Sequence, residues 1–338
     1  MISVKKAFIS FSSLFPLPGL LKFSGLKVLL PYHHVVSNDY LPHIKNLYDY
    51  KSTLAFEKDL DWLLKNFNPI SAHDLYDHCF QNAPLPAGSF LLSFDDGFRE
   101  VYDIIAPMLK KKGVPAIFFI NPAFIDNKEL FYRCKLSLVI EKLRGNPKLL
   151  SLFHSKYFPQ AQRNFLSIRQ SLLQLQYTDR KLADEWGAAC EIDFDQYLED
   201  QQPFMTSSQI KELSSQGFTI GAHSWDHPNY KFLSLNEQLE QTAASLHFIS
   251  SFQDLKTFSF PHEDKNLTQS FFDEQKKKED RILFFGVQNQ KSETGNVVWH
   301  RFNAENPNLD LASLVKGMLV YNGMLRTAGR SAVSRSIT

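Results

Sequence analysis

Residues 90–120 predict a β-strand, an α-helix and a second β-strand, and this unit constrains the fold more than any other part of the sequence. Residues 90–94 and 114–120 are apolar runs of strand length, and the helix between them, over about 102–112, ends at Gly113. A strand, a helix and a strand within about thirty residues form a βαβ unit, whose two strands are parallel. We therefore expect a mainly parallel sheet with helices covering its faces.

The same alternation of strands and helices continues on both sides of this unit. Further strands are predicted at 26–30, 218–222, 257–260, 282–287 and 297–302. Helix starts are predicted from capping signals, in which Ser71 precedes Asp74, Thr206 precedes Gln209 and Ser234 precedes Glu237. A last helix is predicted near 309–320. This alternation admits either a closed barrel or an open sheet.

The chain of 338 residues is expected to form one large domain with additions. Residues 26–322 would form the α/β domain. Residues 128–204 have the pattern of helices with charged faces, and they would be inserted in this domain as a lid or an edge subdomain. Residues 323–338 contain three arginines among small polar residues and are predicted to be a flexible basic tail.

Residues 1–25 form a mostly apolar N-terminal segment. Its apolar run follows Lys5 and Lys6 and ends before Lys22. Two prolines and a glycine interrupt the apolar run, which is too short and too broken to cross a membrane. No small-x-small cleavage site of a signal peptide precedes the first strand. We expect a protein that is cytoplasmic, or associated with the cytoplasmic membrane surface through this segment, in preference to an exported one.

Charge and cysteine content exclude several classes of function. With 37 basic and 36 acidic residues the formal net charge is +1, which offers no electrostatic footprint for nucleic acid. Cys79, Cys134 and Cys190 lack any C-x-x-C spacing, so neither a disulfide framework nor a thiolate zinc site is indicated. Aromatic residues make up 14% of the chain, which suits a neutral sugar whose rings stack on aromatic side chains. No pattern in the sequence defines an oligomeric state.

Two polar motifs follow predicted strands. Asp95 and Asp96 come directly after one strand, and His223 and His227 come after another. Because the carboxyl ends of parallel strands meet at one edge of a sheet, these four side chains are expected to lie close together. His223 and His227 would face the same way if one helical turn follows their strand. Either motif alone is weak evidence, since an Asp-Asp-Gly sequence is more often a turn, but the two together are far less often accidental.

Two imidazoles and one carboxylate form a ligand set that leaves an open coordination position, as in a hydrolytic zinc site. The second carboxylate would then be free to accept a proton from water. Mixed nitrogen and oxygen ligands also admit Co²⁺, Ni²⁺ or Fe²⁺. The expected cofactor is therefore a divalent metal ion, with Zn²⁺ preferred.

The two motifs resemble the signatures of a known family. Residues 93–97, Ser-Phe-Asp-Asp-Gly, resemble the first signature of the polysaccharide deacetylases, also called the NodB homology domain or carbohydrate esterase family 4. Residues 223–228, His-Ser-Trp-Asp-His-Pro, resemble the second, and residues 32–35, Tyr-His-His-Val, resemble the opening motif of many members. The similarity covers roughly residues 26–302 outside the insertion. It implies a distorted (β/α) barrel of about seven strands.

By this resemblance Asp96, His223 and His227 would bind the metal ion, and Asp95 would be the general base. The implied substrate is an acetylated carbohydrate, either an oligo- or polysaccharide or a lipid-linked glycan. The implied reaction is hydrolysis of an N-acetyl group, in which Asp95 takes a proton from the attacking water and acetate and a free amine are released.

The sequence departs from the family pattern in one motif. Members often carry an Arg-x-Pro-Tyr-Gly segment whose arginine orients the base, but residues 259–263 here are Ser-Phe-Pro-His-Glu. Arg301 is the candidate replacement, with an ordinary ion-pair arginine as the alternative. Residues 298–300, Val-Trp-His, resemble the Leu-x-His segment that supplies a general acid, which makes His300 the first candidate for that role and His262 the second. His33 or His34 is expected to line the mouth of the cleft.

Other functions stay open. An O-acetyl esterase would use the same metal ion and base but release an alcohol. A barrel that binds carbohydrate without turnover is also compatible with the altered segment at 259–263. A metal phosphatase or nuclease is disfavoured because no basic cluster surrounds either motif.

Overall fold

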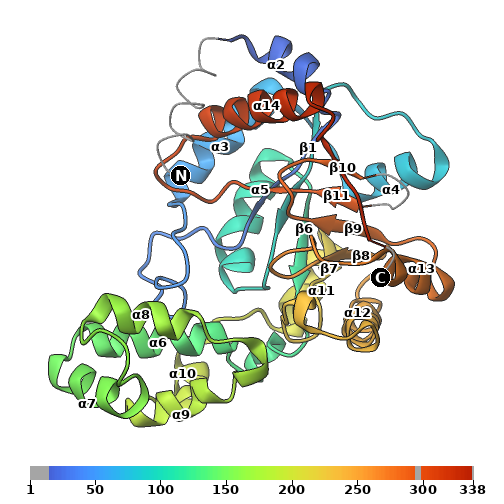
Figure 1. Ribbon diagram of the computed structural model, residues 1–338. Coiled ribbons are helices and arrows are strands. Elements are labelled where there is room, and N and C mark those ends of the chain that lie inside the picture. Colours follow the sequence, from blue (N-terminus) through green and yellow to red (C-terminus); the bar gives the residue numbers. More distant parts are fainter. Residues whose placement is uncertain (1–14, 294–297, 337–338) are drawn as a thin grey trace. The chain divides into compact units, whose positions relative to one another are not determined.

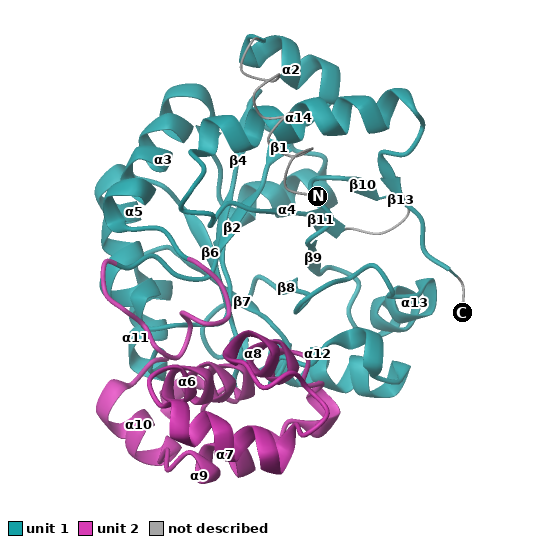
Figure 2. Cartoon of the chain, turned by 60° about the vertical axis from the view of Figure 1, so that its left-hand side comes forward, with its two compact units in different colours: residues 1–37, 50–122, 205–338 teal, residues 38–49, 123–204 magenta. Residues whose placement is uncertain are grey.

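The computed structural model describes residues 15–293 and 298–336 (Figure 1). The chain divides into two compact units, which Figure 2 shows in different colours. Unit 1 comprises residues 1–37, 50–122 and 205–338, and unit 2 comprises residues 38–49 and 123–204. The insertion predicted at 128–204 falls within unit 2. Most of the predicted N-terminal apolar segment, residues 1–14, lies outside the described residues.

Unit 1 is built around a closed parallel barrel. Its main sheet has the strand order β11-β9-β8-β7-β6-β5-β2-β12. Arg301 alone separates β11 (Val298–His300) from β12 (Phe302–Asn303), so the two ends of this order are one strand and the barrel closes with seven. The others are β2 (Pro31–His33), β5 (Leu92–Phe94), β6 (Ala116–Ile120), β7 (Thr219–Ala222), β8 (Thr257–Ser259) and β9 (Leu283–Gly286). The predicted (β/α) barrel of about seven strands is confirmed.

The strands are continuous apolar runs because both of their faces are buried. All five residues of β6 and all four residues of β9 are buried. Alternate residues of these two strands, Ile117 and Phe119 of β6 and Leu283 and Phe285 of β9, pack in one cluster that also contains Leu30 and Leu91. A separate small sheet joins β1 (Val28–Leu29), β4 (Ser89–Phe90) and β3 (Asn68–Pro69).

The helices of unit 1 surround the barrel (Figure 1). They include α3 (Thr53–Asn66), α4 (Ala72–Gln81), α5 (Ala106–Lys112), α11 (Ser207–Ser215), α12 (Leu235–Ile249) and α13 (Gln269–Lys278). Capping boxes are present at Ser71, Thr206 and Ser234, where each side chain accepts a hydrogen bond from the third helical N–H. These three predictions are confirmed. A π-helical turn, Val101–Ile105, leads into α5.

The prediction of a flexible tail from residue 323 is wrong for the described residues. Helix α14 (Leu311–Thr327) continues past residue 323, and β13 (Ala332–Val333) pairs with β10 (Ser292–Glu293). The side chain of Arg335 is almost fully buried and donates to Asp264 at 2.8 Å and to Glu293 at 2.6 Å. The tail is ordered because these buried carboxylates, distant in sequence, receive its charge. Among the described residues, none of the helices combines the length and the apolar character of a membrane-spanning segment.

Unit 2 is a bundle of short helices. It contains α6 (Tyr132–Arg144), α7 (Pro147–Tyr157), α8 (Phe165–Leu173), α9 (Leu182–Ala189) and α10 (Phe194–Gln201). Most side chains of α6 are buried, so this helix forms the centre of the bundle. Residues 38–49 belong to the same unit because Asn46 donates hydrogen bonds to Ser137 O at 3.1 Å and to Glu141 Oε2 at 2.9 Å.

Candidate active site and metal centre

The two polar motifs lie at the carboxyl ends of two strands of the barrel that flank a third strand. Asp95 and Asp96 follow β5, His223 follows β7, and β6 lies between these two strands. The backbone N–H of Asp95 donates to His33 O at 2.9 Å, and that of His223 donates to Ile120 O at 3.0 Å. Each motif therefore starts where the strand pairing still continues, which fixes the direction of its first side chain.

Asp96, His223 and His227 bring one potential ligand atom each to a common point. These three atoms lie within 4.8 Å of one another, and all three side chains are buried. Asp96 Oδ1 is 3.2 Å from His227 Nε2 and 3.5 Å from His223 Nε2. Ligands about 2.1 Å from a tetrahedral ion are about 3.4 Å apart, so the observed spacing suits a single metal ion.

The state of these side chains also suits a metal ion. Asp96 Oδ1 is buried and makes no hydrogen bond within the described residues, which is costly for a carboxylate unless a cation completes it. Burial would raise the pKa of Asp96, but the imidazoles of His227, His34 and His223 outweigh it and lower that pKa. The carboxylate is therefore ionised at neutral pH, as a ligand needs to be.

His223 is held as a neutral imidazole with Nε2 directed toward Asp96. Its Nδ1 lies 2.8 Å from the carbonyl oxygen of Ser259 and donates a hydrogen bond to it. The proton is thus on Nδ1, and the lone pair of Nε2 is available for a metal ion. Burial lowers the pKa of His223 to about 4, so the ring is neutral at physiological pH.

The segment between the two histidines differs from the predicted helical turn. Residues 223–228 are not helical, and Ser224 and His227 have φ angles of 63° and 62°. Ser224 Oγ accepts a hydrogen bond from the His227 N–H at 3.1 Å, which closes a tight turn. Asp96 has a φ of 75°. Left-handed conformations at non-glycine residues cost free energy and gather at functional sites, and here they turn two ligands toward each other.

Two amides that the sequence analysis did not single out hold this turn. Asn121 donates to the carbonyl oxygens of His223 and Ser224, the second at 3.2 Å. Gln241 accepts from the N–H of Trp225 at 2.9 Å and donates to Asp226 at 2.8 Å. Asn121 directly follows β6, as Asp95 follows β5, and this position was the available signal for it.

Asp95 lies beside the three potential ligands and is held by Arg301. Its Oδ2 is 3.9 Å from His223 Nε2. Arg301 donates to both of its oxygens, Nη1 to Oδ1 at 2.7 Å and Nη2 to Oδ2 at 2.8 Å, and also to the hydroxyls of Ser93 and Ser259. Burial raises the pKa of Asp95, but the charge of Arg301, followed by His223, lowers it below the ordinary value.

Arg301 itself is completely buried. Its guanidinium lies over the rings of Tyr32, at 4.6 Å, and Phe119, at 5.1 Å. The structure thus places the guanidinium of Arg301 against the carboxylate for which the sequence analysis proposed it. Ser259, at the position of the family's arginine, contacts Arg301 and does not replace its charge.

The structure does not bring His300 to this cluster. Its Nε2 lies 3.0 Å from Glu293 and its Nδ1 lies 3.5 Å from Asp264. Successive residues of a strand point to opposite sides, so Arg301 faces the cluster and His300 faces away. His262, the second candidate, is exposed, and its ring centroid lies 4.5 Å from that of His227.

His34 lies at the strand end next to Asp95. Strand β2 pairs with β5 so that His33 is opposite Phe94, which places His34 opposite Asp95. His34 Nδ1 is 2.8 Å from Glu305 Oε2, and 19% of its side chain remains exposed. Burial lowers the pKa of His34, but Glu305 and then Asp96 and Asp95 outweigh burial and raise it to about 9.

Glu305 anchors His34 from the neighbouring strand. The other carboxylate oxygen of Glu305 accepts the N–H groups of His34, at 2.8 Å, and Val35, at 2.9 Å. Glu305 was missed because nothing in its local sequence marks it, and only the pairing of β12 with β2 places it there. His33, by contrast, is fully buried and packs against Phe56 and Phe94, so it does not line the mouth of the cleft.

Comparisons with known proteins agree with this fold. A family model described as polysaccharide deacetylase matches residues 82–268. The Streptococcus pyogenes deacetylase PplD, solved with acetate, is similar with a TM-score of 0.55 and 13% identity over 87% of this chain and 98% of that one. IcaB from Ammonifex degensii is similar with a TM-score of 0.52 and 15% identity, over 87% of this chain and 98% of that one. A de-N-acetylase from Aggregatibacter actinomycetemcomitans is similar with a TM-score of 0.51 and 15% identity, over 86% of this chain and 99% of that one. A search of curated protein sequences found no match.

Proposed function

Because this chain belongs to the polysaccharide deacetylase family, we propose that it is a metal-dependent hydrolase that removes N-acetyl groups from a sugar. The substrate would be an oligo- or polysaccharide or a lipid-linked glycan. The observation that supports this most is the cluster of three potential ligand atoms with an arginine-held carboxylate, Asp95, at its side. A carboxylate in that position can take a proton from water while the ligand set keeps a coordination position open.

Asp96, His223 and His227 would hold the ion, with Zn²⁺ first and Co²⁺, Ni²⁺ or Fe²⁺ as alternatives. When bound, the ion supplies a Lewis acid that polarises the acetyl carbonyl and makes water more acidic. The neutral state of His223 and the ionised state of Asp96 prepare these side chains for that ligation.

Asp95 would act as the general base. It accepts a proton from water as the water oxygen forms a bond to the acetyl carbon. Arg301 keeps Asp95 ionised and fixes both of its oxygens, so the proton is received in one orientation. Because the carboxylate is already held in place, less rotational entropy has to be lost when the reactive geometry forms.

His34 would act as the general acid in place of His300. As the bond between the acetyl carbon and the sugar nitrogen breaks, a proton passes from His34 to that nitrogen and the amine leaves. Nδ1 of His34 is engaged by Glu305, so the transferred proton comes from Nε2. The pair with Glu305 keeps the ring protonated at neutral pH, which an acid requires.

An acetate-release assay on the metal-reconstituted protein tests the proposal. We expect acetate from N-acetylated chitooligosaccharides, loss of release on treatment with a chelator, and recovery with added Zn²⁺ or Co²⁺. Release from acetylated xylan and not from chitooligosaccharides would identify an O-acetyl esterase. Bound metal without turnover on any acetylated glycan would instead indicate a carbohydrate-binding barrel.

His34→Gln is expected to lower kcat by about 10²-fold, because loss of a positioned acid typically costs 10²–10⁴-fold. In the wild type, activity should fall as the pH rises through the pKa of His34, since only the protonated ring can donate, and the variant should lose this alkaline limb. The pH dependence of kcat measures both effects. His262→Gln and His300→Gln are the controls, and a larger loss of kcat in either one would contradict the assignment.

A further inference from the structure

Positive charge is concentrated in the two ends of the chain. Residues 1–38 contain four lysines and no acidic residue, and residues 311–338 contain four basic residues and no acidic residue. The rest of the chain, 39–310, holds 29 basic and 36 acidic residues, a net charge of −7. The chain is almost neutral as a whole, but its two ends are basic and the residues between them are acidic. A basic region of this kind attracts an anionic partner.

The described parts of these ends pack together as two helices, α2 (Leu17–Ser24) and α14 (Figure 1). A Cβ atom at Gly323 of α14 would lie 2.0 Å from the ring of Phe23, so only glycine permits this approach. Arg326 lies against Gly25 and donates to Lys22 O at 3.3 Å. We call the exposed surface of these two packed helices and of the residues next to them the α2/α14 face.

The α2/α14 face combines exposed apolar and basic side chains. Its large apolar members are Phe15, Phe23, Tyr321 and Met324, which are 40%, 40%, 45% and 43% exposed. Its exposed basic members are Lys22, Lys27, Arg326 and Arg330. Packed helices that carry both exposed apolar and exposed basic side chains are typical of a surface that enters the interface of an anionic membrane.

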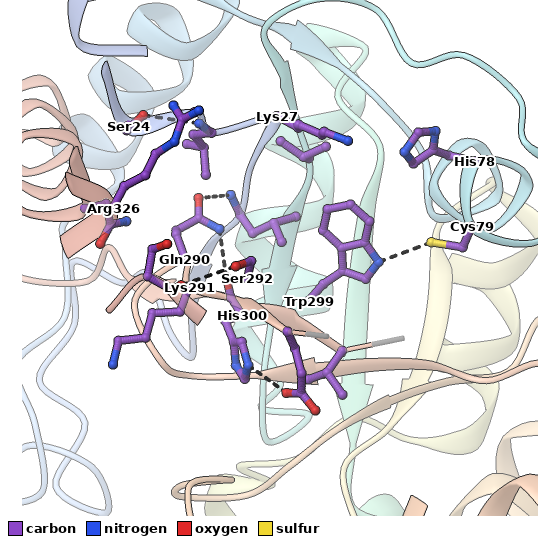
Figure 3. Close-up of a pocket in the computed structure, with 18 residues that line it drawn as sticks. Ser24, Lys27, His78, Cys79, Gln290, Lys291, Ser292, Trp299, His300 and Arg326 are labelled. Carbon is purple, nitrogen blue, oxygen red and sulfur yellow. Dashed lines mark hydrogen bonds and ion pairs between the residues drawn. The ribbon is translucent and has the colours of Figure 1, made fainter. Parts of the chain in front are cut away.

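A recess of about 530 Å³ adjoins this face (Figure 3). Lys27 and Arg326 belong to its wall, together with Lys291 and His78. Its acidic wall residue, Glu293, is already held by Arg335 at 2.6 Å. The basic side chains of the wall therefore outnumber its acidic ones, and the recess has room for a small phosphate-bearing headgroup.

We propose that the α2/α14 face docks unit 1 onto a bilayer that contains anionic lipids. The apolar side chains would enter the headgroup region, and the lysines and arginines would face lipid phosphates. Docking leaves the candidate active site accessible, because residues 25–30 lead from α2 through β1 to the amino end of the barrel strand β2, whereas Asp95 and Asp96 follow the carboxyl end of the neighbouring strand β5. A second copy is a poorer occupant, since two basic faces would repel each other.

Vesicle binding by the full chain tests this proposal. We expect binding to vesicles of equal phosphatidylglycerol and phosphatidylcholine, little binding to phosphatidylcholine alone, and weakening with salt. Lys22→Glu with Lys27→Glu should reduce the affinity at least about 30-fold, the equivalent of about 2 kcal/mol. Tyr321→Gln with Met324→Gln should reduce it about tenfold. Acetate release from a soluble chitooligosaccharide should be unchanged in each variant, which shows that it is folded.

Lys110→Glu with Lys111→Glu is the matched control, because it makes the same change in net charge at exposed positions of α5. An equal loss of affinity in this control would overturn the proposal by attributing binding to net charge alone. Equal binding of the wild type to neutral and anionic vesicles, or binding to neither, would also overturn it. A third outcome would overturn it as well: the wild type is a dimer in solution, the variant with Lys22→Glu and Lys27→Glu is a monomer, and neither binds vesicles. The face would then join two copies of the chain.

Discussion

Asp95→Asn is expected to lower kcat for acetate release by about 10³-fold, within the range that a general base contributes. The amide keeps the shape of the side chain but has no anionic oxygen to accept a proton. Because Asp95 lies outside the three-ligand set, the variant should still bind one metal ion per chain. Steady-state kinetics and metal analysis of the purified protein measure these two quantities.

Asp96→Asn is the matched comparison one residue along. Its lost charge is that of a proposed ligand, so metal affinity should fall together with activity, and excess metal should restore part of the activity. If Asp95→Asn also lost its metal, or kept full activity, the assignment of base and ligand to these adjacent carboxylates would be wrong.

Arg301→Met is expected to lower the free energy of unfolding by about 3–5 kcal/mol, the usual cost of removing one partner of a buried ion pair. Arg301 is completely buried, and its loss removes the cation that is hydrogen-bonded to both oxygens of Asp95. Denaturant unfolding at neutral pH measures the change. A loss below 1 kcal/mol would contradict the proposed contact.

The same variant has a defined pH dependence. In the wild type the pKa of folded Asp95 is lowered, so its contribution to stability is present above the ordinary carboxyl pKa and is lost as the pH falls through the lowered value. Without Arg301, the pKa of Asp95 loses the largest of the interactions that lower it and should rise, so the variant should lose less stability at acidic pH. Asp95→Asn combined with Arg301→Met should therefore be more stable than Arg301→Met alone at neutral pH, which a double-mutant cycle measures.

The barrel and the main cluster could be predicted because they depend on local patterns. Each strand is a short apolar run, and the polar residues that follow it are adjacent in sequence, so Asp95, Asp96 and His223 were placed by the strand ends alone. The turn that orients His227 was not predictable, because its left-handed residues are stabilised by Asn121 and Gln241 from other elements.

The second half of the site depends on contacts between distant segments. Arg301 and His300 were both predicted to belong to the site. Neighbouring residues of one strand face opposite sides, so only one of the two can reach it. Glu305 acquires its position only when β12 pairs with β2, more than 250 residues away in sequence. Likewise, the order of the tail follows from Arg335 reaching Asp264 and Glu293, partners that no local pattern identifies.

The strand that closes the barrel also has a consequence for synthesis. A nascent polypeptide completed through β9 already contains Asp96, His223 and His227, but it lacks Arg301 and Glu305, which arrive with β11 and β12. Such an intermediate would contain the three proposed metal ligands before it contains Arg301 and Glu305, which hold the proposed base, Asp95, and the proposed acid, His34. If the proposed roles hold, the site can become active only after the segment that closes the barrel has been synthesised.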